Sequence, residues 1–133
     1  MTMRNPALIG ILLLPLAVLS PRTAPAQTAP QPIPPTEISA DLGTCSALIT
    51  VTDADSRPIY AAKVATRIHY GMMGVKRLDL EAATSPNGQV KITTLPELLK
   101  KPMFIIISNG DRQQTVEFKP ELRCHATFDV QLR

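Results

Sequence analysis

Apolar and polar residues alternate with a period of two along most of the sequence after residue 37, and turn-forming residues interrupt this alternation at short intervals. The pattern is typical of strands that have one buried and one wet face and are separated by tight turns. Patterns long enough for helices are missing. About seven strands in an antiparallel chain predict an all-β fold, a Greek-key β-sandwich of two sheets. The turn signals are Asp53–Ser56, Gly71–Gly74, Ser85–Gly88, Asn109–Asp111 and Lys119–Pro120.

The alternation predicts which side chains form the core, and two segments depart from it. Residues 103–107 are apolar without a break, which predicts a central strand covered on both faces. Between Leu95 and Lys101 the residues favour one turn of helix, which Pro96 can begin and Pro102 ends. The residues predicted to face inward are Ala47, Ile49, Val51, Val64, Ile68, Tyr70, Leu78, Leu80, Val90, Ile92, Val116 and Phe118.

The N-terminus carries the three parts of a secretory signal peptide, predicted here as residues 1–26. Arg4 supplies the positive charge, residues 7–19 are almost wholly apolar, and Ala24-Pro25-Ala26 places small residues ahead of a scissile bond. An uncleaved anchor is the alternative, but a run broken by Pro15 is shorter than the roughly 20 residues that span a bilayer. We therefore expect a secreted protein, periplasmic or extracellular, that does not insert into a membrane after cleavage.

A tether and a single domain are predicted to follow the cleavage site. Residues 27–37 hold four prolines among small polar residues, a composition that favours an extended chain and cannot bury a core. We therefore predict a Pro-rich flexible tether at 27–37 and one β-sandwich domain at 38–133.

The charge of the chain excludes two classes of partner. Removal of Arg4 and Arg22 with the leader leaves 12 Lys and Arg against 11 Asp and Glu, a net charge of +1. A nearly neutral chain without a Lys/Arg run predicts no binding to nucleic acid or to an anionic membrane surface.

The two cysteines are predicted to form a disulfide between Cys45 and Cys124. Cys124 shares the parity of Ala126 and Phe128, and Cys45 shares that of Ala47, so both thiols are expected to face the core. Both stand at the start of their strands, and the first and seventh strands of an alternating layout run in the same direction. The oxidising compartment outside the cytoplasm favours the bond. Two buried free thiols, or a metal or redox pair, are the alternatives.

Several motifs resemble those of carboxypeptidase-regulatory-like domains. The segment Ile49–Asp53, followed by Arg57-Pro58-Ile59 and Ala62-Lys63-Val64, is similar to the opening of that family, with Arg57 where the family usually has Gly. Thr84–Val90 is similar to its Thr-Asp-x-x-Gly-x-Phe turn, and Leu95-Pro96 to its Leu-Pro. The resemblance implies a transthyretin-like (prealbumin-like) or immunoglobulin-like β-sandwich in a secreted bacterial protein, and it implies little about activity.

No catalytic residue is predicted. A related branch, the hydroxyisourate hydrolases, relies on paired His and Arg residues and a C-terminal Tyr-Arg-Gly-Ser, whereas this chain ends Asp-Val-Gln-Leu-Arg. A Ser/His/Asp hydrolase needs three groups that meet in a pocket. The only imidazoles are His69 and His125, and both are predicted on wet strand faces. The chain is therefore predicted not to be an enzyme and to need no cofactor.

His69, Met72 and Met73 are the candidate binding residues. They lie at the tight Gly71–Gly74 turn, and imidazole and thioether groups suit copper in a secreted protein. A second imidazole would have to converge on them, and His125 is the only one left. We therefore expect that the methionines pack on the edge of the sandwich and that no metal site forms.

As a whole, the sequence predicts a non-catalytic β-sandwich module of the bacterial envelope with a structural or protein-binding role. The expected partner is another envelope or extracellular protein that contacts an edge strand before Gly71, the Gly71–Gly74 turn or the Ser85–Gly88 loop. A small secreted protein that binds copper or carbohydrate is the alternative. Aromatic residues that could stack on a glycan are scarce, because the chain has two Tyr, three Phe and no Trp.

Overall fold

The computed structural model describes residues 10–21, 23 and 31–133. The chain divides into two units, residues 1–30 and residues 31–133. In the first unit the described residues carry no regular secondary structure and are exposed. Arg4, the Ala24–Ala26 cleavage motif and residues 27–30 of the predicted tether fall outside the described residues. In the part of the chain that is described, no helix is long and apolar enough to cross a membrane.

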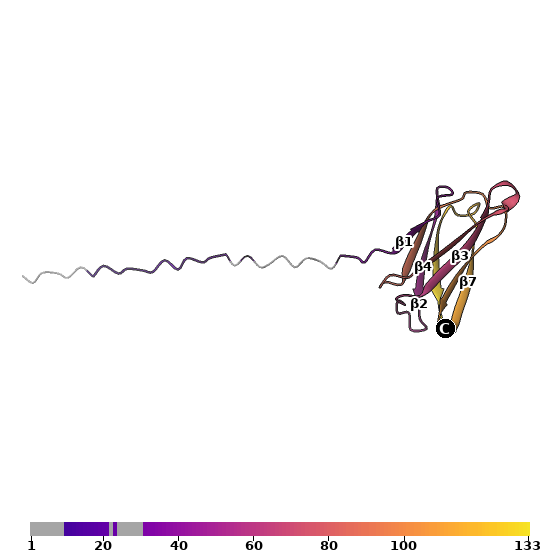
Figure 1. The fold of residues 1–133 in the computed structure, drawn as a ribbon. Helices are drawn as coiled ribbons and strands as arrows, with labels where there is room; N and C mark the ends of the chain where they lie inside the picture. Colours follow the sequence, from indigo (N-terminus) through magenta and orange to yellow (C-terminus); the bar gives the residue numbers. More distant parts are fainter. Residues whose placement is uncertain (1–9, 22, 24–30) are drawn as a thin grey trace, which may run out of the picture. The chain divides into compact units, whose positions relative to one another are not determined.

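The second unit is an all-β sandwich of eight strands in two four-stranded sheets (Figure 1). The first sheet has the strand order β1-β5-β2-β8, and the second has the order β4-β3-β6-β7. A single 3-10 helix, η1, interrupts the strands of this unit. The elements are β1 (Thr36–Ser39), β2 (Cys45–Thr52), β3 (Lys63–Tyr70), η1 (Met72–Gly74), β4 (Lys76–Ala83), β5 (Gln89–Leu95), β6 (Met103–Asn109), β7 (Arg112–Phe118) and β8 (His125–Gln131).

The predicted all-β, two-sheet architecture is confirmed, but the predicted strand count and pairing need correction. An additional strand, β1, begins at Thr36, inside the range predicted as tether, and pairs with β5 in parallel. Strands β2 and β8 are parallel as well, so the sandwich is not antiparallel throughout. Parallel neighbours need a long crossover connection, and here most of the domain lies between β2 and β8 in the sequence.

The predicted helical turn between Leu95 and Lys101 is wrong. Residues 96–101 form bends without helical hydrogen bonding. The carboxylate of Glu97 instead accepts hydrogen bonds from the backbone N and the hydroxyl of Thr44. This tertiary contact overrides the weak local preference for a helix.

The predicted inward-facing residues form the core between the two sheets. Burial alternates along the strands, so that β2 is buried at every second residue from Cys45 to Val51. Tyr70, Leu78, Leu80 and Val116 are only partly buried, because Tyr70 ends β3 and the other three lie on the edge strands β4 and β7. The largest fully buried side chains include Phe118, Ile49, Ile68, Ile92, Leu95, Met103, Ile105, Ile107 and Leu132.

Strand β6 corrects the prediction that residues 103–107 are covered on both faces. Met103, Ile105 and Ile107 are buried in the core. Phe104 and Ile106 point the other way and are 48% and 40% exposed. Although β6 lies between β3 and β7, a sandwich of two layers covers only the inner face of each sheet. The second sheet therefore presents apolar side chains to solvent.

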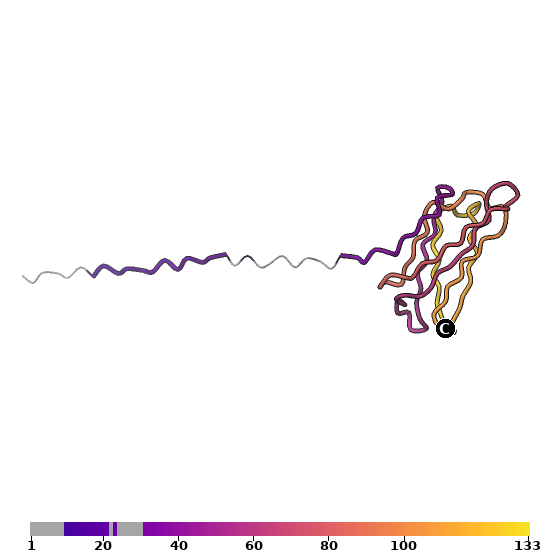
Figure 2. Tube along the Cα trace, viewed as in Figure 1, coloured from indigo at the N-terminus to yellow at the C-terminus, as the bar shows by residue number. Residues whose placement is uncertain are grey.

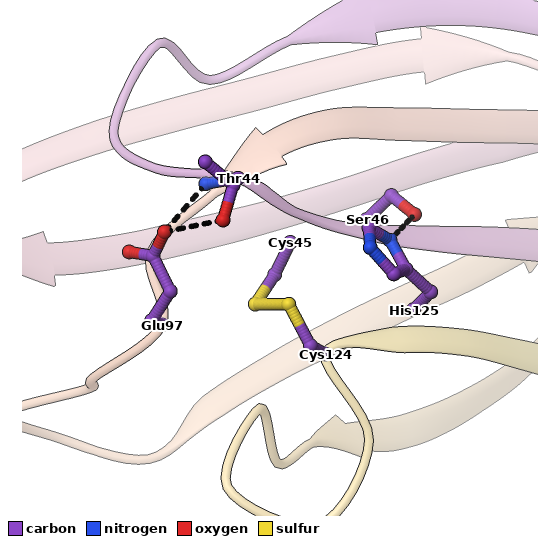
Figure 3. Close-up of a disulfide and its surroundings, with 6 residues drawn as sticks. All are labelled: Thr44, Cys45, Ser46, Glu97, Cys124 and His125. Atoms are coloured by element: carbon purple, nitrogen blue, oxygen red, sulfur yellow. Dashed lines mark hydrogen bonds between the residues drawn. A yellow bond between two sulfur atoms is a disulfide. The ribbon is translucent and has the colours of Figure 1, made fainter.

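A disulfide joins Cys45 and Cys124 with an S–S distance of 2.16 Å, in agreement with the predicted pairing (Figure 3). Cys45 begins β2, Cys124 directly precedes β8, and the register of these parallel strands places Ser46 opposite His125. The bond therefore ties two neighbouring strands of the first sheet to each other. Such a bond is compatible with an extracellular or periplasmic location.

Candidate functional site

The predicted binding residues His69, Met72 and Met73 lie at one end of the second sheet. His69 is half-buried near the end of β3, opposite Arg77 of β4. Met72 and Met73 belong to η1 and are 83% and 81% exposed, so the expected packing of these methionines on the sandwich edge is wrong. Strand β3 pairs with β4 on one side and with β6 on the other. The strand before Gly71 is therefore not an edge strand.

The structure does not bring a second imidazole to this turn. The Nδ1 atom of His125 lies 2.8 Å from the Oγ atom of Ser46, on the outer face of the first sheet. His69 lies on the outer face of the second sheet, so the two imidazoles face away from each other across the sandwich. Over the described residues, no group of three His, Cys, Asp or Glu side chains is placed to hold a metal ion.

Two polar pairs flank the disulfide (Figure 3). Ser46 and His125 have the residue types of a hydrolase dyad, but such a dyad also needs a carboxylate that orients the imidazole. Glu97 does not fill this role, because its Oε1 atom accepts hydrogen bonds from the Thr44 hydroxyl at 2.5 Å and from the Thr44 backbone N at 2.9 Å. The bond from the Thr44 hydroxyl is the main reason that the pKa of Glu97 lies below its ordinary value. The alternation along the strand predicts that the side chain of Ser46 points to solvent, but it does not predict that His125 lies beside it on the neighbouring strand.

A groove crosses the outer face of the second sheet, and we call it the Ala65 groove. Its volume is about 630 Å³. Ala65 of β3 stands in register between Glu81 of β4 and Ile106 of β6. Its single methyl group leaves space between the larger side chains on either side. The groove is lined by Ala65, Thr66, Arg67, Asp79, Leu80, Glu81 and Ile106.

Ion pairs border the Ala65 groove on the β4 side. The Nε atom of Arg67 lies 2.7 Å from Asp79 Oδ1, and the Nε atom of Arg77 lies 3.7 Å from Asp79 Oδ2. Lys63 Nζ lies 3.3 Å from Glu81 Oε2. The hydrogen bond from Arg67 is the largest cause that lowers the pKa of Asp79, so this carboxyl is ionised at neutral pH. Two guanidinium groups thus share one carboxylate, which leaves one positive charge unbalanced.

A second hollow, of about 650 Å³, opens at the side of the sandwich beside β1 and β4. The buried hydroxyl of Thr84 in its wall is already bonded, because it accepts from Ala62 N at 2.8 Å and donates to Ile59 O at 2.6 Å. The charged residues of its lining, Glu37 and Glu81, are both acidic. This hollow has fewer kinds of group that could bind a ligand than the Ala65 groove has. In the Ala65 groove, charged residues of both signs border an apolar floor.

No protein-family model matches the chain, and no curated protein matches it. A catechol 1,2-dioxygenase from Acinetobacter sp. ADP1, inhibited by bound mercury, matches at 15% identity with a TM-score of 0.47, over 75% of this chain and 59% of that chain. A 3-chlorocatechol 1,2-dioxygenase from Rhodococcus opacus 1CP matches at 11% identity with a TM-score of 0.43, over 73% and 64%. The chain therefore spans less than two thirds of the length of either enzyme.

These comparisons correct the predicted resemblance to carboxypeptidase-regulatory-like or transthyretin-like domains, because no such family model matches and the matching structures are catechol dioxygenases. The motifs that resemble those of the family consist of residues that commonly form tight turns. Asp53 Oδ1 accepts hydrogen bonds from the backbone N of Asp55 at 2.8 Å and of Arg57 at 3.0 Å. Gly88 has a φ of 72°, and a Cβ there would collide with the carbonyl oxygen of Val51. Many sandwiches need such residues, so these motifs identify no family.

The predictions of a non-catalytic module and of a chain that is not an enzyme are corrected as well: the two solved structures named above are enzymes, so the comparisons do not support these predictions. These predictions depend on the absence of a catalytic motif in the sequence, but catalytic residues need not be close together in the sequence. In this fold, polar groups meet across strands that lie far apart in the sequence, as Ser46 and His125 do. At these identities and TM-scores, no activity is carried over from the catechol dioxygenases.

Proposed function

We propose that the protein binds a small amphiphilic molecule, with an apolar body and one anionic group, in the Ala65 groove. The observation that carries this proposal is a hollow with an aliphatic floor beside an arginine on an open sheet face. Sites for small molecules are typically concave and mainly apolar, with a few polar groups that fix the orientation of the ligand.

The apolar part of the proposal depends on β6. Phe104 and Ile106 both stand on the outer face of the sheet, and Ile106 forms a wall of the groove. Exposed apolar surface of this kind favours a ligand that covers it. At about 25 cal/mol per Å², covering roughly 100 Å² contributes ~2.5 kcal/mol. An apolar body that lies over Ala65 and against Ile106 would gain this stabilisation.

The anionic part depends on Arg67. Within the described residues, its guanidinium donates one hydrogen bond, from Nε to Asp79, so its other donors remain available. Arg77 places a second positive charge near the same carboxylate. An anionic group of a ligand would balance the excess charge and accept paired hydrogen bonds from the guanidinium.

We also infer that the protein acts outside the cytoplasm, after removal of residues 1–26. The charged, apolar and small-residue segments of the N-terminus support export, and the Cys45–Cys124 bond supports an oxidising compartment. Peptide mapping of the exported protein should find a mature N-terminus near Gln27. A chain that stays in the cytoplasm with both thiols free to react would contradict this inference.

Binding of 1-anilinonaphthalene-8-sulfonate tests the groove, because this probe has an aromatic body and one sulfonate. We expect a saturable rise in fluorescence with one site per chain. Ala65→Leu fills the groove and should weaken the affinity by about 10-fold or more, which corresponds to the loss of one good contact. Arg67→Gln should weaken the affinity by a similar factor and reduce its dependence on salt.

The matched control is Thr127→Leu, because Thr127 is exposed on the outer face of the first sheet. This variant should bind the probe as tightly as the wild type does. Equal affinities of Ala65→Leu and the wild type would contradict the groove as the binding site. Since the probe also binds partly folded chains, all variants are compared below their thermal transitions.

A further inference from the structure

Four apolar side chains stand exposed on two loops at one end of the sandwich, and we call this surface the apolar tip. Met72, Met73 and Val75 come from the turn between β3 and β4, and Val75 is 77% exposed. Leu98 comes from the loop between β5 and β6 and is 78% exposed. Figure 2 shows the turn between β3 and β4 projecting from the end of the sandwich. Single apolar residues on a surface are ordinary, but a group on projecting loops points to a partner.

The two loops of the apolar tip lie side by side. A Cβ built on Gly74 would lie 3.0 Å from the Cβ of Lys100 and 3.7 Å from the Cε of Lys101. Gly71 and Leu98 also line one hollow together with Lys100. The four apolar side chains therefore belong to one surface, although more than twenty positions separate the two loops in the sequence.

The backbone of the turn holds the methionines on the outside. Gly74 is the buried residue of the turn, and its backbone N donates to Gly71 O at 3.2 Å. Val75 N donates to Met72 O at 3.3 Å. Met73 has a φ of 56°, in the left-handed region that residues other than glycine seldom adopt. The turn thus has a defined conformation in which Met72 and Met73 project into solvent.

Three lysines lie in or next to the two loops of the apolar tip. Lys76, Lys100 and Lys101 are exposed, and none of the three forms an ion pair within the described part of the chain. Glu97, the acidic residue of these two loops, is held by hydrogen bonds from Thr44. The two loops together therefore carry an excess of positive charge.

We propose that the apolar tip associates with the surface of an anionic lipid bilayer. The turn that carries the methionines projects from the end of the sandwich (Figure 2), and methionine side chains are flexible and polarisable, so they can enter the acyl region without a complementary pocket. The lysine stems can extend along the apolar boundary while their ammonium groups meet anionic headgroups. A projecting apolar surface with lysines beside it fits the surface of an anionic bilayer better than it fits a partner with a groove. The association is peripheral and requires no spanning segment.

This inference replaces the expectation from the sequence that the chain does not bind an anionic membrane surface. That expectation depended on the near-neutral net charge and the lack of a Lys/Arg run. The fold places Lys76, at the start of β4, near Lys100 and Lys101 of the loop between β5 and β6, so the local charge differs from the overall balance.

A tryptophan reporter tests the proposal in the full chain, which has no tryptophan of its own. In Met73→Trp, vesicles of phosphatidylcholine mixed with phosphatidylglycerol should shift the emission to the blue, and vesicles of phosphatidylcholine alone should shift it far less. Tyr60→Trp is the matched control, because Tyr60 is 69% exposed in the loop before β3, at the other end of that strand from the tip. Its emission should not shift. The reporter responds at its own position, so contacts of the N-terminal segment with lipid do not produce the signal.

Charge substitutions complete the test. Lys100→Gln together with Lys101→Gln, in the Met73→Trp background, should weaken vesicle affinity by roughly 30-fold at low ionic strength. Binding of the anilinonaphthalene probe in the Ala65 groove should stay unchanged, which separates this proposal from the proposed function. An unshifted Met73→Trp emission, or an equal shift in Tyr60→Trp, would overturn the membrane proposal. Retention on polyglutamate without any response to vesicles would also overturn it, in favour of an acidic protein partner.

Discussion

The two sheets of the sandwich share one core but differ in what they turn toward solvent. The first sheet carries the disulfide, and its outward residues are polar except for Leu48, which is half-buried. The second sheet has no covalent cross-link, and it exposes Phe104 and Ile106 on its central strand beside several ion pairs. The same period-two pattern thus produces one outer face that is almost wholly polar and one outer face that exposes apolar side chains beside ion pairs.

From this difference we infer different roles for the two sheets. A cross-linked sheet with a polar outer face stabilises the fold and offers little apolar surface to a ligand. The second sheet contains the Ala65 groove, and its β3–β4 turn supplies most of the apolar tip. Mutations in the first sheet should therefore act mainly on stability, whereas mutations on the outer face of the second should act mainly on binding.

Removal of the disulfide should have the largest effect and tests the role of the first sheet. The bond joins residues 79 positions apart. In the chain-entropy model, a loop of this length raises the free energy of unfolding by up to about 4.5 kcal/mol. Urea unfolding of Cys45→Ala with Cys124→Ala would measure the loss. Amides that exchange through global unfolding should all lose this same amount of protection, whereas the ends of β2 and β8 beside the bond should lose additional protection through local opening. No additional loss at these ends, compared with β3 and β6, would break the comparison between the sheets.

Adjacent residues of β6 test the two faces of the second sheet, with an intermediate effect. Ile105→Ala removes a fully buried side chain and should lower the free energy of unfolding by about 2–5 kcal/mol. Ile106→Ala changes a side chain that is 40% exposed, and it should cost less than about 1.5 kcal/mol while weakening probe binding in the groove. Equal losses of stability would mean that the outer face is covered in solution, which would remove the basis for the binding role.

The inner faces could be predicted from the sequence because strand alternation depends only on local geometry. Every second residue of β2 is buried for this reason, and the shared direction of β2 and β8 followed from counting strands. Strand β1 could not be predicted in the same way. Its four residues include one apolar side chain that faces the core, Ile38, and the strand exists because β5 pairs with it.

The candidate site was harder to predict, because it depends on the register between strands that are far apart in the sequence, and the residues of one strand do not determine that register. Ala65, Glu81 and Ile106 form one row across three strands, and no spacing in the sequence relates them. The apolar run of β6 is the available signal, and it predicts coverage on both faces because an unbroken apolar run is typical of a central strand that is buried on both sides. Residue type alone predicts His69 and Met73 as binding residues, and this remains a prediction, whereas the loop that lies beside their turn is known only from the fold.

The smallest effect concerns the ion pair of Arg67 and Asp79, which tests whether charge is fixed at the Ala65 groove. The pKa of Asp79 is lowered from an ordinary value of 3.8, chiefly by the hydrogen bond from Arg67. A lowered pKa stabilises the folded state above pH 3.8, and this contribution is lost as the pH falls through the lower folded pKa. In Arg67→Gln, the pKa of Asp79 should therefore rise toward 3.8, as measured by NMR of the carboxyl carbon.

Lys63→Gln is the matched control for this titration, because it removes the neighbouring ion pair with Glu81 and leaves the partners of Asp79 in place. The pKa of Asp79 should not change in this variant. An unchanged pKa in Arg67→Gln would show instead that the guanidinium is not held beside the groove in solution. The contrast between the two sheets would then depend on Phe104 and Ile106 alone, and a ligand of the groove would need no anionic group.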